Sequence, residues 1–118
     1  MSSCIFCDIV NKKIPSDIIL ENDALVAFHD IRPKAPVHVL IVPKKHVASV
    51  NEFTKEDVPV IAALMFAVPV VAEAVGVKDG YKIAFNVGRK GGQLIDHVHM
   101  HLLAWPDSPE GKKEVAPV

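Results

Sequence analysis

One segment of the chain, residues 97–103, constrains the fold most strongly because it alternates histidines with apolar residues as HVHMHLL. Successive side chains of a β-strand point to opposite faces of the sheet. In a strand, His97, His99 and His101 would therefore share one face, and the apolar residues would share the other. A row of imidazole rings adds nothing to a hydrophobic core. The pattern therefore predicts a strand with one packing face and one functional face.

The rest of the chain supplies the partners that such a strand needs. Four other segments have the composition of strands and are bounded by turn residues, at 17–20, 24–29, 37–42 and 81–87, and the histidine strand is predicted at 97–104. One long helix is predicted at 54–75. We therefore predict an α+β fold, with an antiparallel sheet of about five strands and one main helix. The 118 residues fit a single domain, 1–118, with a short polar tail from about residue 105. We expect the first few residues and the last dozen to lie over the surface.

The predicted helix carries signals at both ends. Thr54 can cap its first turn, with Asp57 three residues later in the arrangement of a capping box. Gly76 is placed to end it. Between them, apolar residues recur at helical spacing, and Pro69 is expected to bend the helix.

The helix is also unusual in having no charge from Val58 to Ala72. A bilayer span needs about twenty apolar residues, and this stretch is shorter and contains two prolines, so we interpret it as a buried helix and expect no membrane. A helix that is apolar all round is buried all round, yet one small chain covers only one side. A homodimer would cover the other side, which is predicted to present Val60, Ala63, Phe66, Ala67 and Val70.

Charge and cysteine content narrow the class of protein. The formal net charge of −1 argues against a nucleic-acid polymer as partner, because such binding depends on many lysine and arginine contacts to phosphate. The N-terminus has no basic region followed by an apolar run, so we expect a cytoplasmic protein. In that compartment the C-x-x-C pair Cys4 and Cys7 indicates either half of a metal site or a redox motif.

Several other residues are placed to join the histidine face. His38 alternates with apolar neighbours in its predicted strand, and Asn86 is flanked by Phe85 and Val87. The glycine-rich stretch 91–93 comes just before the histidines, where glycines let the backbone approach an anionic oxygen. A neutral imidazole beside phosphate-binding backbone suits nucleophilic attack at phosphorus through a covalent intermediate.

These residues resemble the histidine triad family, whose signature alternates three histidines with apolar residues. Further stretches are similar to its nucleotide-binding branch, the purine nucleoside phosphoramidases, at 28–31, 35–38, 41–46, 86–88 and 91–93. The resemblance implies an α+β fold whose sheet continues across a homodimer. It also implies a hydrolase or transferase that cleaves at the α-phosphate of purine nucleoside monophosphate derivatives such as nucleoside 5'-phosphoramidates.

The resemblance also assigns roles to residues. His99 would be the nucleophile, with His101 and His38 as its supporting shell. Asp30 would bind the ribose hydroxyls, Asn86 would face the sugar-phosphate and Gln93 would lie near the phosphate. The base pocket and the remaining substrate-binding positions would be formed by Phe6, Ile9, Phe28, His29, Ile31, Gly92 and Leu94. Leu94 departs from the serine that eukaryotic members carry there, and a leucine cannot donate a proton to the leaving group.

Cys4 and Cys7 resemble a zinc-binding subset of the family, in which the other two ligands would be His46 and His97. Two thiolates and two imidazoles complete a tetrahedral zinc site and leave no open position, so the metal would be structural. A redox role is less favoured, because the pair is not predicted to lie between a strand and the start of a helix.

Two other functions remain open at the level of sequence. The three histidines could themselves bind a catalytic zinc ion, since three imidazoles and a water form an open site. Alternatively, the chain could be a nucleotide-binding regulatory module with little turnover.

Overall fold

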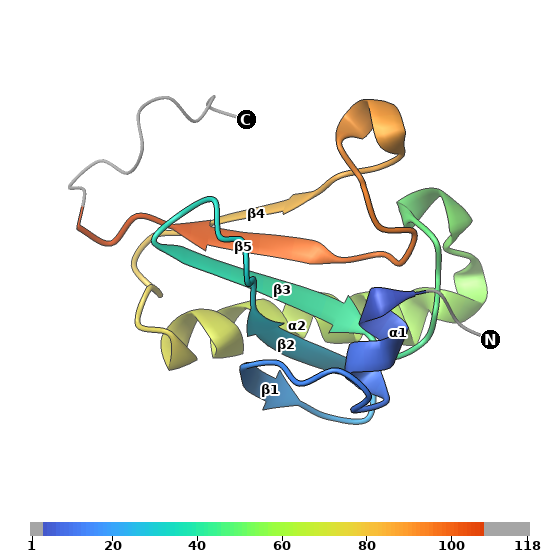
Figure 1. The fold of residues 1–118 in the computed structure, drawn as a ribbon, viewed down its shortest axis with the longest axis horizontal. Helices are drawn as coiled ribbons and strands as arrows, with labels where there is room; N and C mark the ends of the chain where they lie inside the picture. Colours follow the sequence, from blue (N-terminus) through green and yellow to red (C-terminus); the bar gives the residue numbers. More distant parts are fainter. Residues whose placement is uncertain (1–3, 108–118) are drawn as a thin grey trace.

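The sheet at the centre of the fold confirms the predicted α+β class. A computed structural model describes residues 4–107, and within them five strands form one sheet in the order β1-β2-β3-β5-β4, with every neighbouring pair antiparallel (Figure 1). The strands are β1 (Ile18–Glu21), β2 (Leu25–His29), β3 (Val37–Pro43), β4 (Lys82–Phe85) and β5 (Met100–Ala104). Short 3-10 turns occur at Val50–Glu52, Lys55–Asp57 and Arg89–Gly91.

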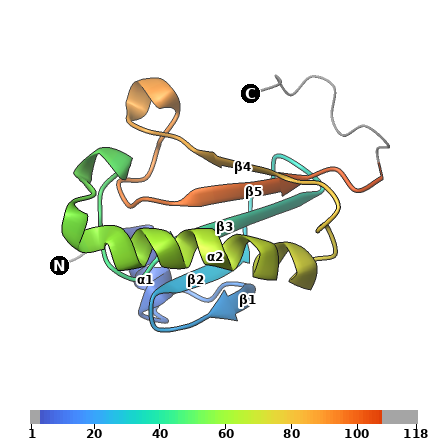
Figure 2. The same ribbon diagram turned by 180° about the vertical axis from the view of Figure 1, so that it is seen from behind.

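Helix α2 (Val58–Ala74) covers one face of this sheet (Figure 2). Its residues Leu64, Val68 and Val71 form one buried cluster with strand residues that include Ile41 and Met100. Alternation along the strands explains why these residues share a face, because odd positions of β3 and even positions of β5 point toward α2. This cluster is the main hydrophobic core.

The predicted signals at both ends of the helix are present, but α2 itself begins at Val58, later than the predicted start at Thr54. The Thr54 side chain and the Asp57 carboxylate form a reciprocal capping box around the 3-10 turn that leads into the helix. At the other end Gly76 has φ of +76°, and the N–H groups of Gly76 and Val77 donate to the carbonyls of Glu73 and Ala72. This is the Schellman arrangement, in which a glycine adopts the left-handed conformation. The helix continues through Pro69.

Helix α1 (Ile5–Val10) was not predicted, and it packs on the opposite face of the sheet from α2 (Figures 1 and 2). Phe6 and Ile9 are buried against the strand residues Phe28 and Leu40. Their spacing of three residues is the only periodic signal in a helix of six residues, which is too short for periodicity to identify. The chain from Ile5 onward is therefore part of a second core and not a loose surface segment.

The histidine strand is shorter than predicted. Strand β5 begins at Met100, so His97 and His99 lie in an irregular segment before it, and the prediction of one strand over 97–104 is wrong at its start. Within β5 the alternation holds, since Met100 and Leu102 pack toward α2 while His101 points to the face that α1 covers. The three histidines are consequently not three equivalent positions on one strand.

The outer side of α2 is apolar and exposed. The segment Lys55–Ala74 is long and apolar enough to cross a membrane by length and composition, but a core helix passes the same test and one side of α2 packs on the sheet. On the other side Phe66 is 79% exposed and Val70 is 53% exposed. Ala67 is buried within the core, so its predicted place on the outer patch is wrong.

The end of the chain is described only in part. Pro106 and Asp107 form a turn after β5, as the sequence predicts. The rest of the predicted tail lies outside the described residues.

Candidate active site

A cavity of about 480 Å³ opens between α1, the ends of β2 and β5, and the loop before β5. Every residue that the family resemblance assigned to substrate binding lines it, with the exception of Gln93, and so do His99 and His101. The lining also includes residues that were not predicted, namely Ile5, Ile14, Pro15, Ser16, Arg32, Lys34, Leu40 and Ile95. Ile5 lies on α1, Ile14, Pro15 and Ser16 lie in the segment after it, and Arg32 and Lys34 lie on the loop after β2.

His99 is held in one tautomer by its neighbour in the chain. Its Nδ1 lies 2.8 Å from the backbone carbonyl oxygen of His97. Because a carbonyl only accepts, Nδ1 carries the proton and donates, and Nε2 keeps an unprotonated lone pair. The ring is buried, with 7% exposed, and packs edge to face against Phe6 at a centroid distance of 4.9 Å. The remaining nitrogen of this cavity-lining ring is therefore the one that can act as a nucleophile.

His38 and His101 form a second ordered pair. The Lys34 backbone N–H donates to His38 Nδ1 at 3.0 Å, so His38 carries its proton on Nε2. That nitrogen lies 2.9 Å from His101 Nδ1, which must accept, and the proton of a neutral His101 is then on Nε2. His38 does not line the cavity. It supports His101 from behind, and His101 presents an N–H donor to the cavity.

Burial keeps these rings neutral. Burial lowers the pKa of His38 and of His99, and in each case the nearby Asp30 charge acts in the opposite direction. For His101, burial followed by repulsion from His99 and His38 lowers the pKa to about 4. The neutral form agrees with the hydrogen bonds, because His38 both accepts and donates and His101 accepts at Nδ1.

The wall beside the histidines combines one carboxylate with an apolar surface. Asp30 follows β2, and its Oδ2 lies 3.6 Å from His38 Nε2, while its Oδ1 accepts the Arg32 N–H at 2.9 Å. Phe6 and Phe28 meet edge to face at 5.9 Å. A planar apolar group can therefore lie against this wall with a polar group near the carboxylate.

The glycine-rich loop forms the other wall. Gly92 has φ of +90°, a left-handed conformation that favours glycine. The Asn86 amide donates to the Gly91 carbonyl at 2.8 Å, which holds the loop against the end of β4. Leu94 lines the cavity with 75% of its surface exposed, so an apolar side chain occupies this part of the wall.

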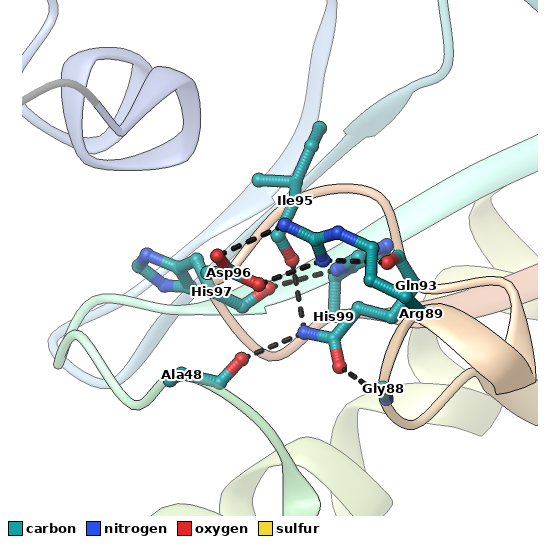
Figure 3. A network of polar contacts seen from close by, with 8 residues as sticks. All are labelled: Ala48, Gly88, Arg89, Gln93, Ile95, Asp96, His97 and His99. Atoms are coloured by element: carbon teal, nitrogen blue, oxygen red, sulfur yellow. Dashed lines mark hydrogen bonds and ion pairs between the residues drawn. The ribbon is translucent and has the colours of Figure 1, made fainter.

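Gln93 is the one predicted substrate-binding residue that the structure places elsewhere. Its side chain is buried beneath the loop, where the amide nitrogen donates to the carbonyls of Ala48 and Ile95 at 2.7 and 2.9 Å. Its amide oxygen accepts the Gly88 N–H at 3.0 Å (Figure 3). Arg89 adds a bond to the Gln93 carbonyl at 2.7 Å and a bidentate ion pair with Asp96. Gln93 therefore braces the loop and does not line the cavity.

The predicted metal ligands do come together. Potential ligand atoms of Cys4, Cys7, His46 and His97 all lie within 4.8 Å of one another, so this group can hold a metal ion. The His97 Nδ1 lies 3.3 Å from Cys4 Sγ and 3.2 Å from His46 Nδ1. Its Nε2 donates to the Pro43 carbonyl at 2.8 Å, which leaves the lone pair of Nδ1 directed into the cluster. A histidine that binds a metal usually donates its other ring N–H to a carbonyl or a carboxylate, which fixes the orientation of the ring.

This arrangement argues against a metal held by the three histidines. His97 directs one nitrogen to the cysteine cluster and the other to a carbonyl, while His99 has one nitrogen occupied by a carbonyl. The cysteine pair lies at the start of a helix that was not predicted, although no strand precedes it within residues 4–107. Cys4 is the N-cap of α1, and its sulfur accepts the Cys7 N–H at 3.3 Å, so the pair does lie at the start of a helix. Its proximity to His46 and His97 is now the reason to favour a metal.

Comparison with known proteins places this site in a family. A family model described as "Scavenger mRNA decapping enzyme C-term binding" matches residues 3–116. Protein HitA of Neisseria gonorrhoeae is 41% identical over 106 residues, covering 90% of this chain and 99% of HitA. The purine nucleoside phosphoramidase of Escherichia coli K12 is 40% identical over 100 residues, which is 84% of each chain. The structure of a HIT family hydrolase from Clostridium thermocellum superposes with a TM-score of 0.86 at 36% identity, over 100% of this chain and 97% of the other.

The cavity and the ordered histidines lie on an α+β sheet of the kind found in a HIT family hydrolase. The chain belongs to the histidine triad family, and its relatives include hydrolases and a purine nucleoside phosphoramidase.

The buried histidines predict that acid destabilises the protein. The pKa of His101 is about 4 in the folded state and near 6.5 when the chain is unfolded. Between these values the unfolded chain binds the extra proton, so the free energy of unfolding falls as pH falls through this range. In His101→Gln this part of the decline should be absent. Urea unfolding at steps from pH 7.5 to about 4.5 should give a shallower curve for the variant, and two parallel curves would contradict the assignment.

Proposed function

We propose that the chain is a nucleotide hydrolase or transferase that acts on nucleoside 5'-phosphoramidates or related derivatives of purine nucleoside monophosphates. The observation that carries this proposal is the His99 Nδ1–H bond to the His97 carbonyl, which leaves Nε2 as a fixed, unprotonated nitrogen in the cavity. The relation to a purine nucleoside phosphoramidase at 40% identity supports the substrate class.

In the first proposed step, the His99 Nε2 lone pair attacks the α-phosphorus and forms a P–N bond. The bond from phosphorus to the leaving group breaks, and its electron pair departs with the leaving nitrogen or oxygen. The attacking imidazole becomes cationic, and the His97 carbonyl that accepts its Nδ1–H stabilises that charge. An amine leaving group also takes up a proton. Because Leu94 has no proton to give, the His101 Nε2–H is the group proposed to protonate the leaving amine, and His38 supports His101 from behind.

In the second proposed step, water attacks the same phosphorus and the P–N bond to His99 breaks. The imidazole leaves as a neutral ring, and the proton lost by water passes to solvent or back along the His101 and His38 pair. The products are a nucleoside monophosphate and the regenerated enzyme. Transfer to another acceptor follows the same course with that acceptor in place of water.

The two walls of the cavity support the placement of a nucleotide. Asp30 can accept hydrogen bonds from both ribose hydroxyls, and the apolar wall of Phe6, Ile9 and Phe28 suits a purine ring. Asn86 and the backbone of Gly92 lie at the opposite wall, where the phosphate would need donors. Ile31 is 85% exposed, which suits a residue that is covered only when a base is bound.

The metal in this proposal is zinc, held by Cys4, Cys7, His46 and His97. Tetrahedral zinc with bonds of about 2.0–2.3 Å sets its ligand atoms roughly 3.3–3.8 Å apart. The cluster has sulfur-to-nitrogen distances of 3.2, 3.3 and 3.5 Å. Bound there, zinc would supply a structural cross-link between α1 and the segment before β5. A cytoplasmic location, where thiols stay reduced, belongs to the same proposal.

The protein is also proposed to work as a homodimer. The outer side of α2 exposes Phe66, Val70 and Met65 next to one another in the helix, and a two-fold partner would cover this patch with its own copy. The family resemblance implies a sheet that continues across such a pair, and β4 lies at one edge of the sheet.

The role of His99 predicts that His99→Ala loses turnover by several orders of magnitude, because no other residue can form the intermediate. Release of AMP from adenosine 5'-phosphoramidate measures this. AMP binding should be retained, since residues other than His99 provide the proposed base and ribose contacts. His101→Ala is the control and should be milder. A His99→Ala protein with near-native kcat would refute the mechanism.

The metal site predicts about one zinc per chain by elemental analysis. The double variant Cys4→Ser, Cys7→Ser should lose the metal and melt at a lower temperature, because metal binding adds to folding free energy. Serine is itself a good N-cap, so α1 keeps its cap and the loss of stability reports the metal. Protein that is purified without chelator and contains no metal would count against the site.

The dimer predicts a mass of twice 12.8 kDa by light scattering at micromolar concentration. Phe66→Glu should give monomer or aggregate, because it places an unpaired charge in the interface, whereas Phe66→Leu should remain dimeric. Ala67→Glu is no test of the interface, because Ala67 lies in the core. A monodisperse wild-type monomer over that concentration range would rule out the dimer.

A further inference from the structure

Gln93 is a buried polar residue whose hydrogen bonds join three separate parts of the backbone. With 2% of its surface exposed, it bonds to Gly88 at the start of the glycine-rich loop, to Ile95 near its end, and to Ala48 on a different segment (Figure 3). Both N–H donors and the oxygen of its amide are in use. Such a group fixes the relative positions of its partners, because breaking any one bond leaves a buried polar atom unsatisfied.

The segment that this brace holds is the one that leads to the nucleophile. Residues 95–99 precede β5 and have no place in the strand ladder. The Val98 N–H donates to the Val47 carbonyl at 2.7 Å, which attaches this segment to the stretch that follows β3. The Gln93 bond to Ala48 is a second attachment to the same stretch. The His97 carbonyl, which orients His99, lies between the Gln93-held Ile95 and Val98. Its position is therefore set by these two attachments.

We propose that Gln93 is a positioning residue for His99. Its carboxamide fixes the turn at Ile95 against Ala48 and so holds the His97 carbonyl where it keeps the nucleophilic nitrogen of His99 unprotonated and aimed into the cavity. This inference rests on the proposed role of His99 as nucleophile.

The same loop offers a matched control on its outer side. Asp96 pairs with Arg89 at 2.8 Å, and the two side chains are 68% and 58% exposed. Exposed ion pairs contribute little to stability. Asp96→Asn therefore removes the charge of an exposed pair in the same loop and leaves the hydrogen bonds of the Gln93 side chain in place.

The decisive variant is Gln93→Met, which keeps the length of the side chain and removes its hydrogen bonds. With adenosine 5'-phosphoramidate, kcat should fall by about 10- to 100-fold, the usual effect of displacing a reacting group by a fraction of an ångström to one ångström. The Kd for AMP should change by less than about threefold, because α1 and β2 provide the base and ribose contacts. Asp96→Asn should keep kcat within about twofold of wild type. If Gln93→Met does not fold, Gln93→Asn, which has an amide that cannot span the same distance, should show the same split.

A spectroscopic measurement separates this inference from the proposed function. Nitrogen NMR of the imidazole rings should show His99 as the Nδ1–H tautomer in wild type and a mixture of tautomers in Gln93→Met. An inactive wild type would refute the proposed function and leave this test in force. A kcat for Gln93→Met within about twofold of wild type, a parallel loss of kcat and AMP affinity, or an unchanged His99 spectrum would overturn the role of Gln93.

Discussion

The antiparallel pairing of β3 with β5 is the contact on which both the core and the site depend. Its register places Ile41 opposite Met100 and Leu40 opposite His101. Because side chains alternate along each strand, this register sends Ile41, Met100 and Leu102 toward α2, and the same step sends His38 and His101 toward α1. A shift of one residue would exchange the two sets and would place imidazoles in the core. Burial of the core side and the chemistry of the other side are thus fixed by the same backbone bonds.

His97 links the candidate metal cluster to the proposed reaction chemistry. Its ring joins the cysteine cluster and is anchored by the Pro43 carbonyl, while its own carbonyl accepts the His99 proton. A displacement of this residue would change both the candidate ligand set and the hydrogen bond that sets the tautomer of His99. The attachments around it, from Val98 to Val47 and from Gln93 to Ala48, confine it from both sides. This explains why so many buried polar bonds are concentrated in a short irregular segment.

Much of the fold could be predicted from sequence, because its signals are local. The five strands, the helix with its Thr54 cap and Gly76 end, and the nearness of His38 to the histidine segment follow from alternation, capping chemistry and turn residues. The parts that could not be predicted depend on tertiary contacts. Helix α1 is stabilised by the burial of Phe6 and Ile9 against β2 and β3 and is too short for a periodic signal. Gln93 looks like a ligand-binding residue in sequence, and only the positions of Ala48 and Gly88 show that its amide is already satisfied.

Because β5 starts only at Met100, the three histidines of the segment have different surroundings. A regular strand through His97 would point all three histidines in one direction, and the three rings would then face the same environment and compete for the same ligand. The strand instead begins only at Met100, so His97 turns to the cysteine cluster, His99 presents Nε2 to the cavity, and His101 alone keeps its strand position with His38 behind it. The alternating pattern is thus the requirement for bringing the histidines together, and the departure from strand geometry is what lets each of them take a different task.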